Sequence, residues 1–179
     1  VAPAERFFRF MEESKTFTGI PNPREAFNVS NIIHDDLGVT HIRSVQQFRG
    51  IEIYGSETTL HLDKNTERLT GSLWAVKENT RTIPEISFEQ SILIANRDCG
   101  KSTVLRELSV EERRFLHYDG PAYNLVLFKT DEGDFRLTWE ITIRPNFIEE
   151  WKYFIDAADG NILRKYNNTN YDGPLTGNA

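Results

Sequence analysis

The sequence has very little cysteine, no long apolar run and no surplus of basic charge. Its single cysteine, Cys99, among 179 residues can form neither an intramolecular disulfide nor a thiolate zinc site. No stretch of about 18 apolar residues occurs, so no transmembrane helix is predicted. Asp and Glu outnumber Lys and Arg by 27 to 21, giving a formal net charge of -6. Because phosphate neutralisation supplies most nucleic-acid affinity, an acidic chain without a basic stripe is a poor candidate for binding nucleic acid.

Sequence motifs for catalysis or metal binding are also missing. There is no H-E-x-x-H, H-x-x-x-H or G-x-S-x-G pattern, and the four histidines are scattered: His34, His41, His61 and His117. Residues 95–102 read ANRDCGKS, a relaxed phosphate-loop match, but the residues before them favour a helix, whereas a phosphate loop follows a strand. We interpret this segment as a polar turn stopped by Gly100. The sequence therefore predicts no catalytic residue and no metal ligand in this chain.

The apolar content is sufficient for a folded core. Hydrophobic residues make up 39% of the chain, which contains 12 Phe, 6 Tyr and 3 Trp. This composition excludes a disordered or collagen-like chain. The sequence starts at Val1 without Met or a basic-then-apolar leader, so we expect that a signal peptide was removed or that the chain was trimmed.

The N-terminal half is predicted to combine helical segments with an antiparallel sheet. Apolar residues recur with helical spacing at Ala4, Phe7, Phe8 and Met11. A second, weak helix is predicted over residues 24–37, ended by Gly38. From residue 40 onward the apolar residues follow a period of two, which indicates strands. The expected strands are residues 40–48, 51–54, 57–63 and 67–76.

The C-terminal half is predicted to contain two capped helices and a second sheet. Ser87 with Gln90, and Ser109 with Glu112, have the spacing of a capping box, in which two side chains satisfy free backbone N–H groups at a helix start. Alternation with a period of two comes after these helices and indicates strands. The expected strands are residues 123–129, 135–144, 151–155 and a return after the Asp159-Gly160 turn.

We therefore predict an α+β fold of two small subdomains, each an antiparallel sheet with helices packed on one face. The polar segment 77–84 shows no periodicity and is interpreted as the linker between them. The predicted divisions are residues 1–76, the linker 77–84, residues 85–166 and a junction segment 167–179.

Residues 41–63 carry a family resemblance. They read HIRSVQQFRGIEIYGSETTLHLD and resemble the H-[VI]-R-x-x-Q-x-[YF]-x-G-x-x-V-[YF]-G-x-E-x-x-x-H-x-D block of the fungalysin/thermolysin-type propeptide (FTP) domain. Two positions depart from this pattern, Glu52 where Pro is frequent and Ser56 where Gly is frequent, which bears on strand geometry. The motif residues expected to be structural first and partner-contacting second are Arg43, Gln46, Gly50, Glu57 and Asp63.

The rest of the chain is similar to the region after the FTP domain in such precursors. Residues 85–166 resemble the propeptide-type domain called PepSY, although residues 104–118 match it poorly. Residues 172–177 read DGPLTG and resemble the D-G-P-x-T-G junction near the start of mature enzymes in some thermolysin-like precursors. The resemblance therefore covers nearly the whole chain.

The resemblance implies a non-catalytic pro-region of a secreted thermolysin-like (M4) zinc metallopeptidase precursor. Such a pro-region is expected to inhibit the cognate catalytic domain, to assist its folding and to be removed by proteolysis. That catalytic domain is the expected partner, and the chain is expected to be exported and monomeric, with no membrane span and no nucleic acid. No cofactor is expected in this chain, because zinc and calcium are expected only in the catalytic domain.

The C-terminal segment is the candidate for entering the peptidase cleft. An extended peptide rich in Asn and Gly can pair its backbone with an edge strand of a protease. The residues assigned to this cleft-binding or processing segment are Tyr166, Asn167, Asn168, Thr169, Asn170, Tyr171 and Asp172. Two other interpretations stay open: a disordered terminus, or a whole chain that is a free-standing secreted binding or regulatory module without catalysis.

Overall fold

The computed structural model describes residues 2–169, which divide into two compact units. Unit 1 contains the residues up to Ile83 together with Val126–Leu137, and unit 2 contains Pro84–Leu125 and the residues from Thr138 onward. Both units contain helices and strands, which confirms the α+β class. The segment 126–137 belongs to unit 1, whereas the sequence division placed it in the second subdomain.

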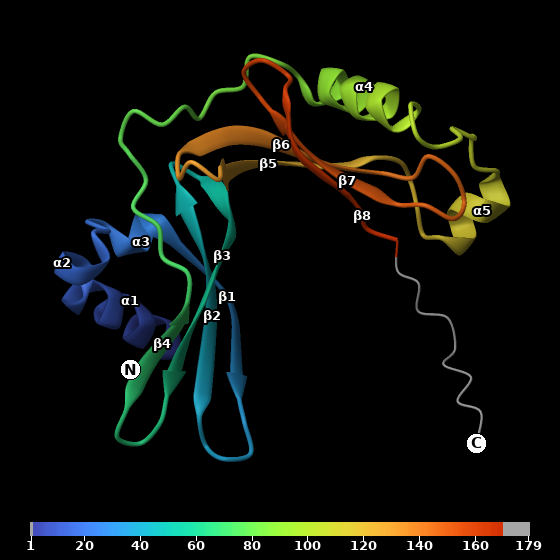
Figure 1. Cartoon of the computed structure of the whole chain (residues 1–179). Helices are drawn as coiled ribbons and strands as arrows, with labels where there is room; N and C mark the ends of the chain where they lie inside the picture. Colours follow the sequence, from blue (N-terminus) through green and yellow to red (C-terminus); the bar gives the residue numbers. More distant parts are fainter. Residues whose placement is uncertain (1, 170–179) are drawn as a thin grey trace. The chain divides into compact units, whose positions relative to one another are not determined.

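Unit 1 is an antiparallel sheet with helices (Figure 1). The helices are α1 (Pro3–Glu13), α2 (Lys15–Thr18) and α3 (Pro23–Ala26), and the strands are β1 (Phe27–His34), β2 (Thr40–Phe48), β3 (Ile51–Leu62) and β4 (Glu67–Gly71). The four strands pair in chain order, each antiparallel to its neighbour. β3 also pairs in parallel with β5 (Ala122–Lys129), where Ile53 faces Leu127. This short parallel pairing differs from the purely antiparallel sheet predicted from the sequence.

The predicted helix over residues 24–37 is wrong. The structure has only the four-residue α3 there, and the chain continues as β1 from Phe27. Val29, Ile32 and Ile33 are β-branched, which lowers helix propensity and favours a strand. β1 pairs with β2 from Phe27 to His34 except at a bulge at Ser30, so the sheet ladder satisfies most of its backbone hydrogen bonds.

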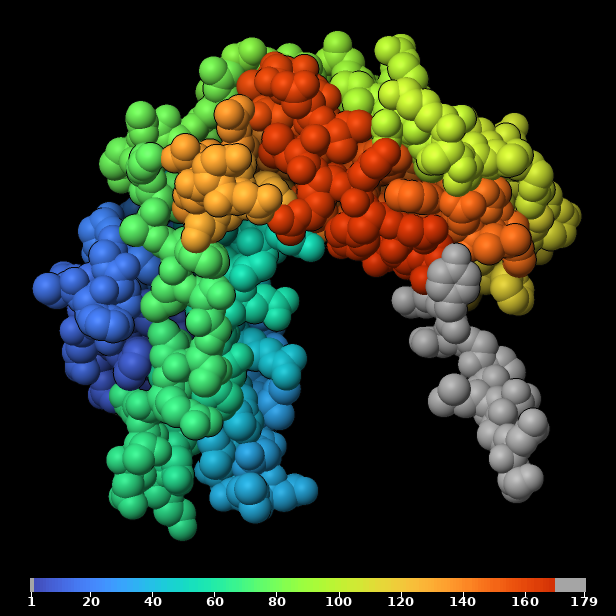
Figure 2. Space-filling view, in the orientation of Figure 1, coloured from blue at the N-terminus to red at the C-terminus, as the bar shows by residue number. Residues whose placement is uncertain are grey.

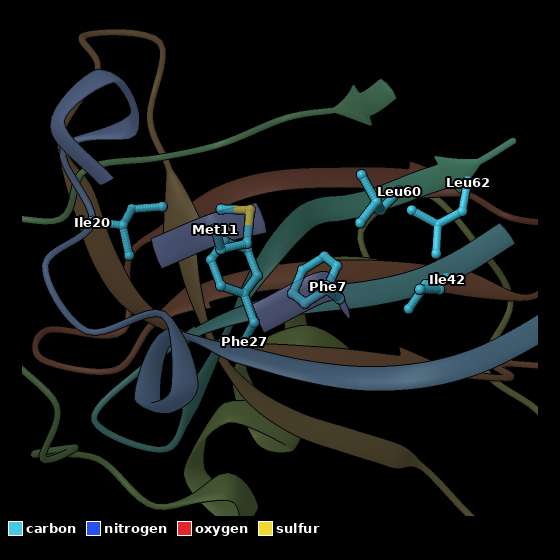
Figure 3. Packing of buried hydrophobic residues seen from close by; sticks show 7 residues of the cluster. All are labelled: Phe7, Met11, Ile20, Phe27, Ile42, Leu60 and Leu62. Atoms are coloured by element: carbon cyan, nitrogen blue, oxygen red, sulfur yellow. The ribbon is translucent and has the colours of Figure 1, made fainter. Parts of the chain in front are cut away.

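α1 is anchored by apolar residues on one face. Phe7 and Met11 are fully buried and, being four residues apart, point to the same side of the helix. They pack in one cluster with Ile20, Phe27, Ile42, Leu60 and Leu62 (Figure 3). Pro3 lies in the first turn, where its missing N–H removes no helical hydrogen bond. The helix therefore covers the face of the sheet that carries these side chains of β2 and β3.

Unit 2 packs α4 (Phe88–Cys99) against an antiparallel sheet. The strands β6 (Phe135–Ile143), β7 (Trp151–Asp156) and β8 (Ile162–Asn167) pair in that order. Ala95 and Cys99 of α4 are buried in one cluster with Ile141, Tyr153 and Ile155. This cluster is the core of unit 2.

Both predicted capping boxes are present. Ser87 Oγ accepts from the Gln90 N–H at 3.3 Å, and Gln90 Oε1 accepts from the Ser87 N–H at 2.8 Å. At the start of α5 (Val110–Phe115), Ser109 and Glu112 make the same reciprocal pair, at 3.2 and 2.9 Å. These local signals therefore located two helix starts that the apolar pattern alone left vague.

The phosphate-loop interpretation of residues 95–102 is excluded by their place in the helix. α4 ends at Cys99, and Gly100 is its C-terminal cap. A phosphate loop holds its anion at a helix N-terminus, where free N–H groups and the helix dipole favour negative charge. The segment lies at the opposite end, so it is the polar helix end that the sequence indicated.

Candidate functional site

The family block 41–63 forms the β2–β3 hairpin, and its Gly50 lies in the turn. Phe48 faces Ile51 across the hairpin, which leaves a two-residue loop of Arg49 and Gly50. Both loop residues have positive φ, 50° at Arg49 and 80° at Gly50, as a type I′ turn requires. Glycine adopts this conformation at little cost, so the geometry gives the motif position a structural reason.

Gln46 lies where β3 bulges away from β2. Val45 faces Glu57 and Gln47 faces Glu52, so one residue of β2 stands opposite four residues of β3, 53–56. The Ser56 hydroxyl fills the gap: it accepts from the Gln46 N–H at 3.0 Å and donates to the Gln46 carbonyl at 3.2 Å. A glycine at position 56 would leave these buried backbone groups without this partner. The departure of Ser56 from the family pattern therefore has a local structural role.

The Gln46 side chain clamps the segment after β4. β4 ends at Gly71, earlier than predicted. Three residues later, the Gln46 side chain forms hydrogen bonds with the backbone of Trp74. The buried Gln46 amide donates to the Trp74 carbonyl at 2.5 Å and accepts from the Trp74 N–H at 2.9 Å. Lys129 Nζ lies 3.6 Å from the centre of the Trp74 ring. A side chain thus supplies the two hydrogen bonds that a neighbouring strand would otherwise make.

A hollow of about 550 Å³ lies beside this clamp in unit 1. Its lining includes Gln46, Gly50 and Trp74 together with the carboxylates of Glu25 and Glu78. The lining carries no histidine, cysteine or serine.

Arg43 and Glu57 lie exposed on one face of the β2–β3 pair. Arg43 faces Thr59 and Glu57 faces Val45, so the two charged residues are diagonal neighbours in the sheet. Both line an open polar groove of about 440 Å³. Within residues 2–169 neither side chain makes a hydrogen bond or an ion pair. These two motif residues are thus available to a partner, whereas Gln46 and Gly50 are used within the fold.

Asp63 starts the turn between β3 and β4. Its N–H donates to the Thr66 carbonyl at 3.0 Å, and its carboxylate accepts from the Lys64 N–H at 2.5 Å. An Asp that bonds the backbone just after it is typical of turn initiation. The structure therefore gives Asp63 a local role in the hairpin.

A relay of hydrogen bonds crosses β2 and β3 near this turn. Asp35 Oδ2 accepts from His41 Nε2 at 2.9 Å, and the Nδ1 atoms of His41 and His61 are 2.7 Å apart. His61 Nε2 is 2.8 Å from the Thr70 hydroxyl. If Thr70 donates to His61 and His61 donates to His41, every group of the relay is satisfied with both imidazoles neutral. Two N–H groups would stand face to face only with both rings protonated, because the Thr70 hydroxyl can turn to accept from His61 Nε2 when a single proton is added.

This relay predicts that unit 1 loses stability in mild acid. Burial, and then the charges of His41 and Arg68, hold the pKa of His61 below its usual value. The unfolded chain takes up this proton near pH 6.5, and the folded chain only at lower pH. Stability present above about pH 6.5 is therefore lost as the pH falls below it. We expect this loss in urea unfolding measured between pH 8 and pH 5, reported by amide exchange in β2 and β3.

The control for the relay is a second histidine of unit 1. His61→Asn should flatten the stability profile just below about pH 6.5, whereas His34→Asn should leave it unchanged. The pKa of Asp35 is also low, first because of its hydrogen bond from His41, and its contribution is lost only at more acidic pH. An unchanged profile in His61→Asn would show that the relay does not set the pH dependence.

The candidate cleft segment is only partly described. Tyr166 and Asn167 belong to β8, where they face Lys152 and Trp151. Asn168 N–H donates to the Glu150 carbonyl at 2.7 Å, and Thr169 Oγ1 accepts from the Glu150 N–H at 2.9 Å. Asn170, Tyr171 and Asp172 lie outside the described residues. The first four residues of the segment are thus bonded to unit 2.

The described residues contain no constellation for catalysis by this chain. No group of three or more His, Cys, Asp or Glu residues within positions 2–169 could hold a metal ion. Burial raises the pKa of the Cys99 thiol, which keeps it in the unreactive protonated form. No helix among these residues is both long enough and apolar enough to cross a membrane.

Comparison with known proteins identifies a propeptide motif in unit 1. Residues 25–67 match the Fungalysin/Thermolysin Propeptide Motif. Thermolysin of Alicyclobacillus acidocaldarius subsp. acidocaldarius is 32% identical over 174 residues, covering 93% of this chain and 30% of that protein. Bacillolysin of Bacillus amyloliquefaciens is 29% identical over 164 residues, covering 87% of this chain and 29% of that protein. The chain thus spans about 30% of the length of the curated relatives it matches.

A solved structure, the Bacillus megaterium YpeB C-terminal domain, is also similar. It covers 93% of this chain and 64% of its own, with a TM-score of 0.42 and 15% sequence identity. A likeness at this level supports no conclusion about function.

The chain is therefore of the propeptide class and is not itself a peptidase, because the matched family region is a propeptide motif rather than a catalytic domain. The motif and the matches over most of the chain support a propeptide of a thermolysin-like (M4) metallopeptidase precursor. The motif residues were identified from the sequence, but the hydrogen bonds of Gln46 with Ser56 and Trp74 were not predicted. The departure at Ser56 from the family pattern was one signal of them in the sequence.

Proposed function

We propose that this chain is the inhibitory and folding-assisting pro-region of a secreted thermolysin-like zinc metallopeptidase, and that proteolysis removes it. The observation that carries the proposal is the propeptide motif at residues 25–67, within a match that extends over 93% of the chain. Unit 2, of PepSY type, belongs to the same pro-region. Zinc and calcium are held by the catalytic domain, to which the pro-region binds as a monomer.

While the pro-region is still covalently joined to the enzyme, weak contacts are sufficient to keep the two domains docked. A pro-region joined to its enzyme docks at an effective concentration in about the millimolar range. After cleavage the affinity must come from the interface itself, which in a stable complex buries about 1,600 Å² in total. The unpaired side chains of Arg43 and Glu57 are suited to polar contacts in such an interface.

The cleft is entered by the chain beyond Thr169. Tyr166 and Asn167 are paired in β8 and the next two residues bond Glu150, so releasing them would cost hydrogen bonds of unit 2. We therefore assign the cleft-binding part to the later residues of the candidate segment, Asn170, Tyr171 and Asp172. An extended peptide there can add a strand to an edge of the enzyme.

Inhibition tests this function. The enzyme is the domain encoded after this chain in its own precursor, in which an H-E-x-x-H helix is expected about a hundred or more residues beyond Ala179. The 1–179 chain, added to the purified enzyme, should inhibit it at near-equal molar amounts. No H-E-x-x-H downstream, or full activity in the presence of 1–179, would overturn the proposal.

A truncation tests the cleft assignment separately. A chain ending at Thr169 keeps all of β8 (Ile162–Asn167), whereas one ending within the strand would damage unit 2. We expect the 1–169 chain to inhibit at least tenfold more weakly than 1–179 while retaining measurable binding. Equal inhibition by both chains would remove the tail from the cleft but leave the interface in place.

Refolding tests the folding role. A pro-region that binds the folding transition state of the enzyme lowers the barrier and speeds folding. Denatured catalytic domain, diluted with and without an equal amount of this chain, should recover several-fold more activity with it after the pro-region is digested. Equal recovery in the two samples would reject the folding role.

A further inference from the structure

An exposed apolar surface lies at one end of unit 2, on the segment that resembles the PepSY pattern least. It is formed by two stretches of chain, one including α5 and the other between β6 and β7. Phe115 is 74% exposed, Ile148 68% and Val104 77%. We define the 104–148 patch as the four exposed apolar residues Val104, Phe115, Phe147 and Ile148.

The two stretches of the patch are held together by direct contacts. The Arg106 N–H donates to the Pro145 carbonyl at 2.7 Å, and Asn146 Nδ2 donates to the Val104 carbonyl at 3.2 Å. The rings of Phe115 and Phe147 lie 5.9 Å apart, centre to centre. Figure 2 shows the yellow-green residues around 105 and the orange residues near 147 lying against each other. The patch is therefore one built surface and not a set of scattered side chains.

The patch contributes nothing to the core of unit 2. That core is the cluster beneath α4, whereas α5 has no buried residue. α5 is nevertheless kept folded: its capping box satisfies the first N–H groups, and Arg106 Nη2 bonds Glu112 Oε1 at 2.6 Å. A monomeric protein rarely exposes clustered large apolar side chains unless something binds them. The polar Arg106–Glu112 pair beside the patch is typical of an interface rim.

The chain leaves unit 2 beside this patch. Asn168 and Thr169, the last described residues, both bond Glu150, which is two residues from Ile148. The ten residues 170–179 can span at most about 35 Å. A domain joined after residue 179 would therefore begin within reach of the 104–148 patch, at high effective concentration.

We infer that the 104–148 patch is the surface through which unit 2 docks on the peptidase domain of the precursor. The inference rests on the proposed function and adds to it the surface and its chemistry. The complementary surface on the peptidase domain is apolar, because polar groups buried against Phe115, Phe147 and Ile148 would lose their hydrogen bonds to water without replacement. The net charge of -6 disfavours an anionic lipid surface as the occupant.

The test compares two polar variants of the 1–179 chain. Phe115→Gln with Ile148→Gln changes the patch, and Phe17→Gln changes an even more exposed aromatic residue of unit 1, 94% exposed. Inhibition constants are measured against the purified peptidase domain, and circular dichroism checks that each variant keeps the wild-type fold. We expect the patch variant to inhibit at least tenfold more weakly and Phe17→Gln to inhibit as the wild type does.

The outcomes separate this inference from the proposed function. Failure of the wild-type chain to inhibit would refute the function itself. Wild-type inhibition combined with equal inhibition by the patch variant would refute the inference alone. Light scattering gives a further check: a wild-type dimer that the patch substitutions convert to a monomer would show that a second copy covers the patch, which would also overturn the inference.

Discussion

Replacing Gly71 by alanine is expected to destabilise unit 1 by about 3 kcal/mol or more. A Cβ atom at this position would lie 2.3 Å from the Glu57 carbonyl oxygen and 2.8 Å from the Thr58 Cα. Both atoms belong to the backbone of β3, which cannot move without breaking the ladder. The φ of 115° adds strain for any residue with a side chain. Urea unfolding with amide exchange of β2 and β3 measures the loss in unit 1.

Gly55→Ala separates close approach from backbone strain. Gly55 has a φ of 74°, but a Cβ there would meet no atom within 4 Å. Only the left-handed conformation is then penalised, at about 1–2 kcal/mol. The close-approach explanation predicts that Gly71→Ala costs clearly more than Gly55→Ala. Equal costs, or a Gly71→Ala chain as stable as the wild type, would contradict it.

The helices α1, α4 and α5 were predicted correctly because the residues that mark them in the sequence also stabilise them. The spacing of Phe7 and Met11 placed α1, and the capping boxes at Ser87 and Ser109 placed the starts of α4 and α5. In each case the residues that give the signal also make the contact, either in the core or at the helix end. Such predictions need no knowledge of the rest of the fold.

The error at residues 24–37 has the opposite cause. β1 is largely exposed, so its apolar residues show no alternation that would identify a strand. Its conformation is fixed by the ladder to β2, the next strand in the chain, and its β-branched residues agree with that pairing. Exposed edge strands are where tertiary pairing most easily overrides a weak local preference.

The candidate site depends on the β3 bulge, which the sequence did not predict. In a regular antiparallel hairpin the numbers of two facing residues have a constant sum, which is 99 for the Phe48–Ile51 pair. Without a bulge, His41 would therefore face residue 58. The three extra residues of the bulge instead set His41 opposite His61, where the sum is 102. The histidine relay and the Ser56 contacts are consequences of this shift. Gly55, with its positive φ, was the available hint of irregular backbone.

The motif residues divide into two groups once the bulge is known. Gln46, Gly50 and Asp63 make turns and hydrogen bonds within unit 1. Arg43 and Glu57 are exposed and unpaired within residues 2–169. Exposed charges without a partner in the fold contribute little to its stability. The proposed function therefore predicts that Arg43 and Glu57 contact the enzyme.

Gln46→Leu is expected to destabilise unit 1 by about 2–3 kcal/mol. Leucine nearly preserves the volume but removes both hydrogen bonds to Trp74, whose N–H and carbonyl then lose their partners. The segment after β4 should detach from β2 even where the sheet persists. Amide exchange resolves this, because the Trp74 N–H donates to Gln46 Oε1 in the native chain and should exchange faster in the variant.

Two substitutions make the prediction specific to the clamp. Gln46→Glu keeps an acceptor for the Trp74 N–H but places an oxygen against the Trp74 carbonyl, so it should destabilise while leaving this amide partly protected. Gln47→Leu removes only an exposed bond, from Gln47 Nε2 to the Glu25 carbonyl at 2.9 Å, and should change stability by less than about 1 kcal/mol. If the Trp74 amide stays fully protected in Gln46→Leu, the side-chain clamp does not hold this segment and another contact must.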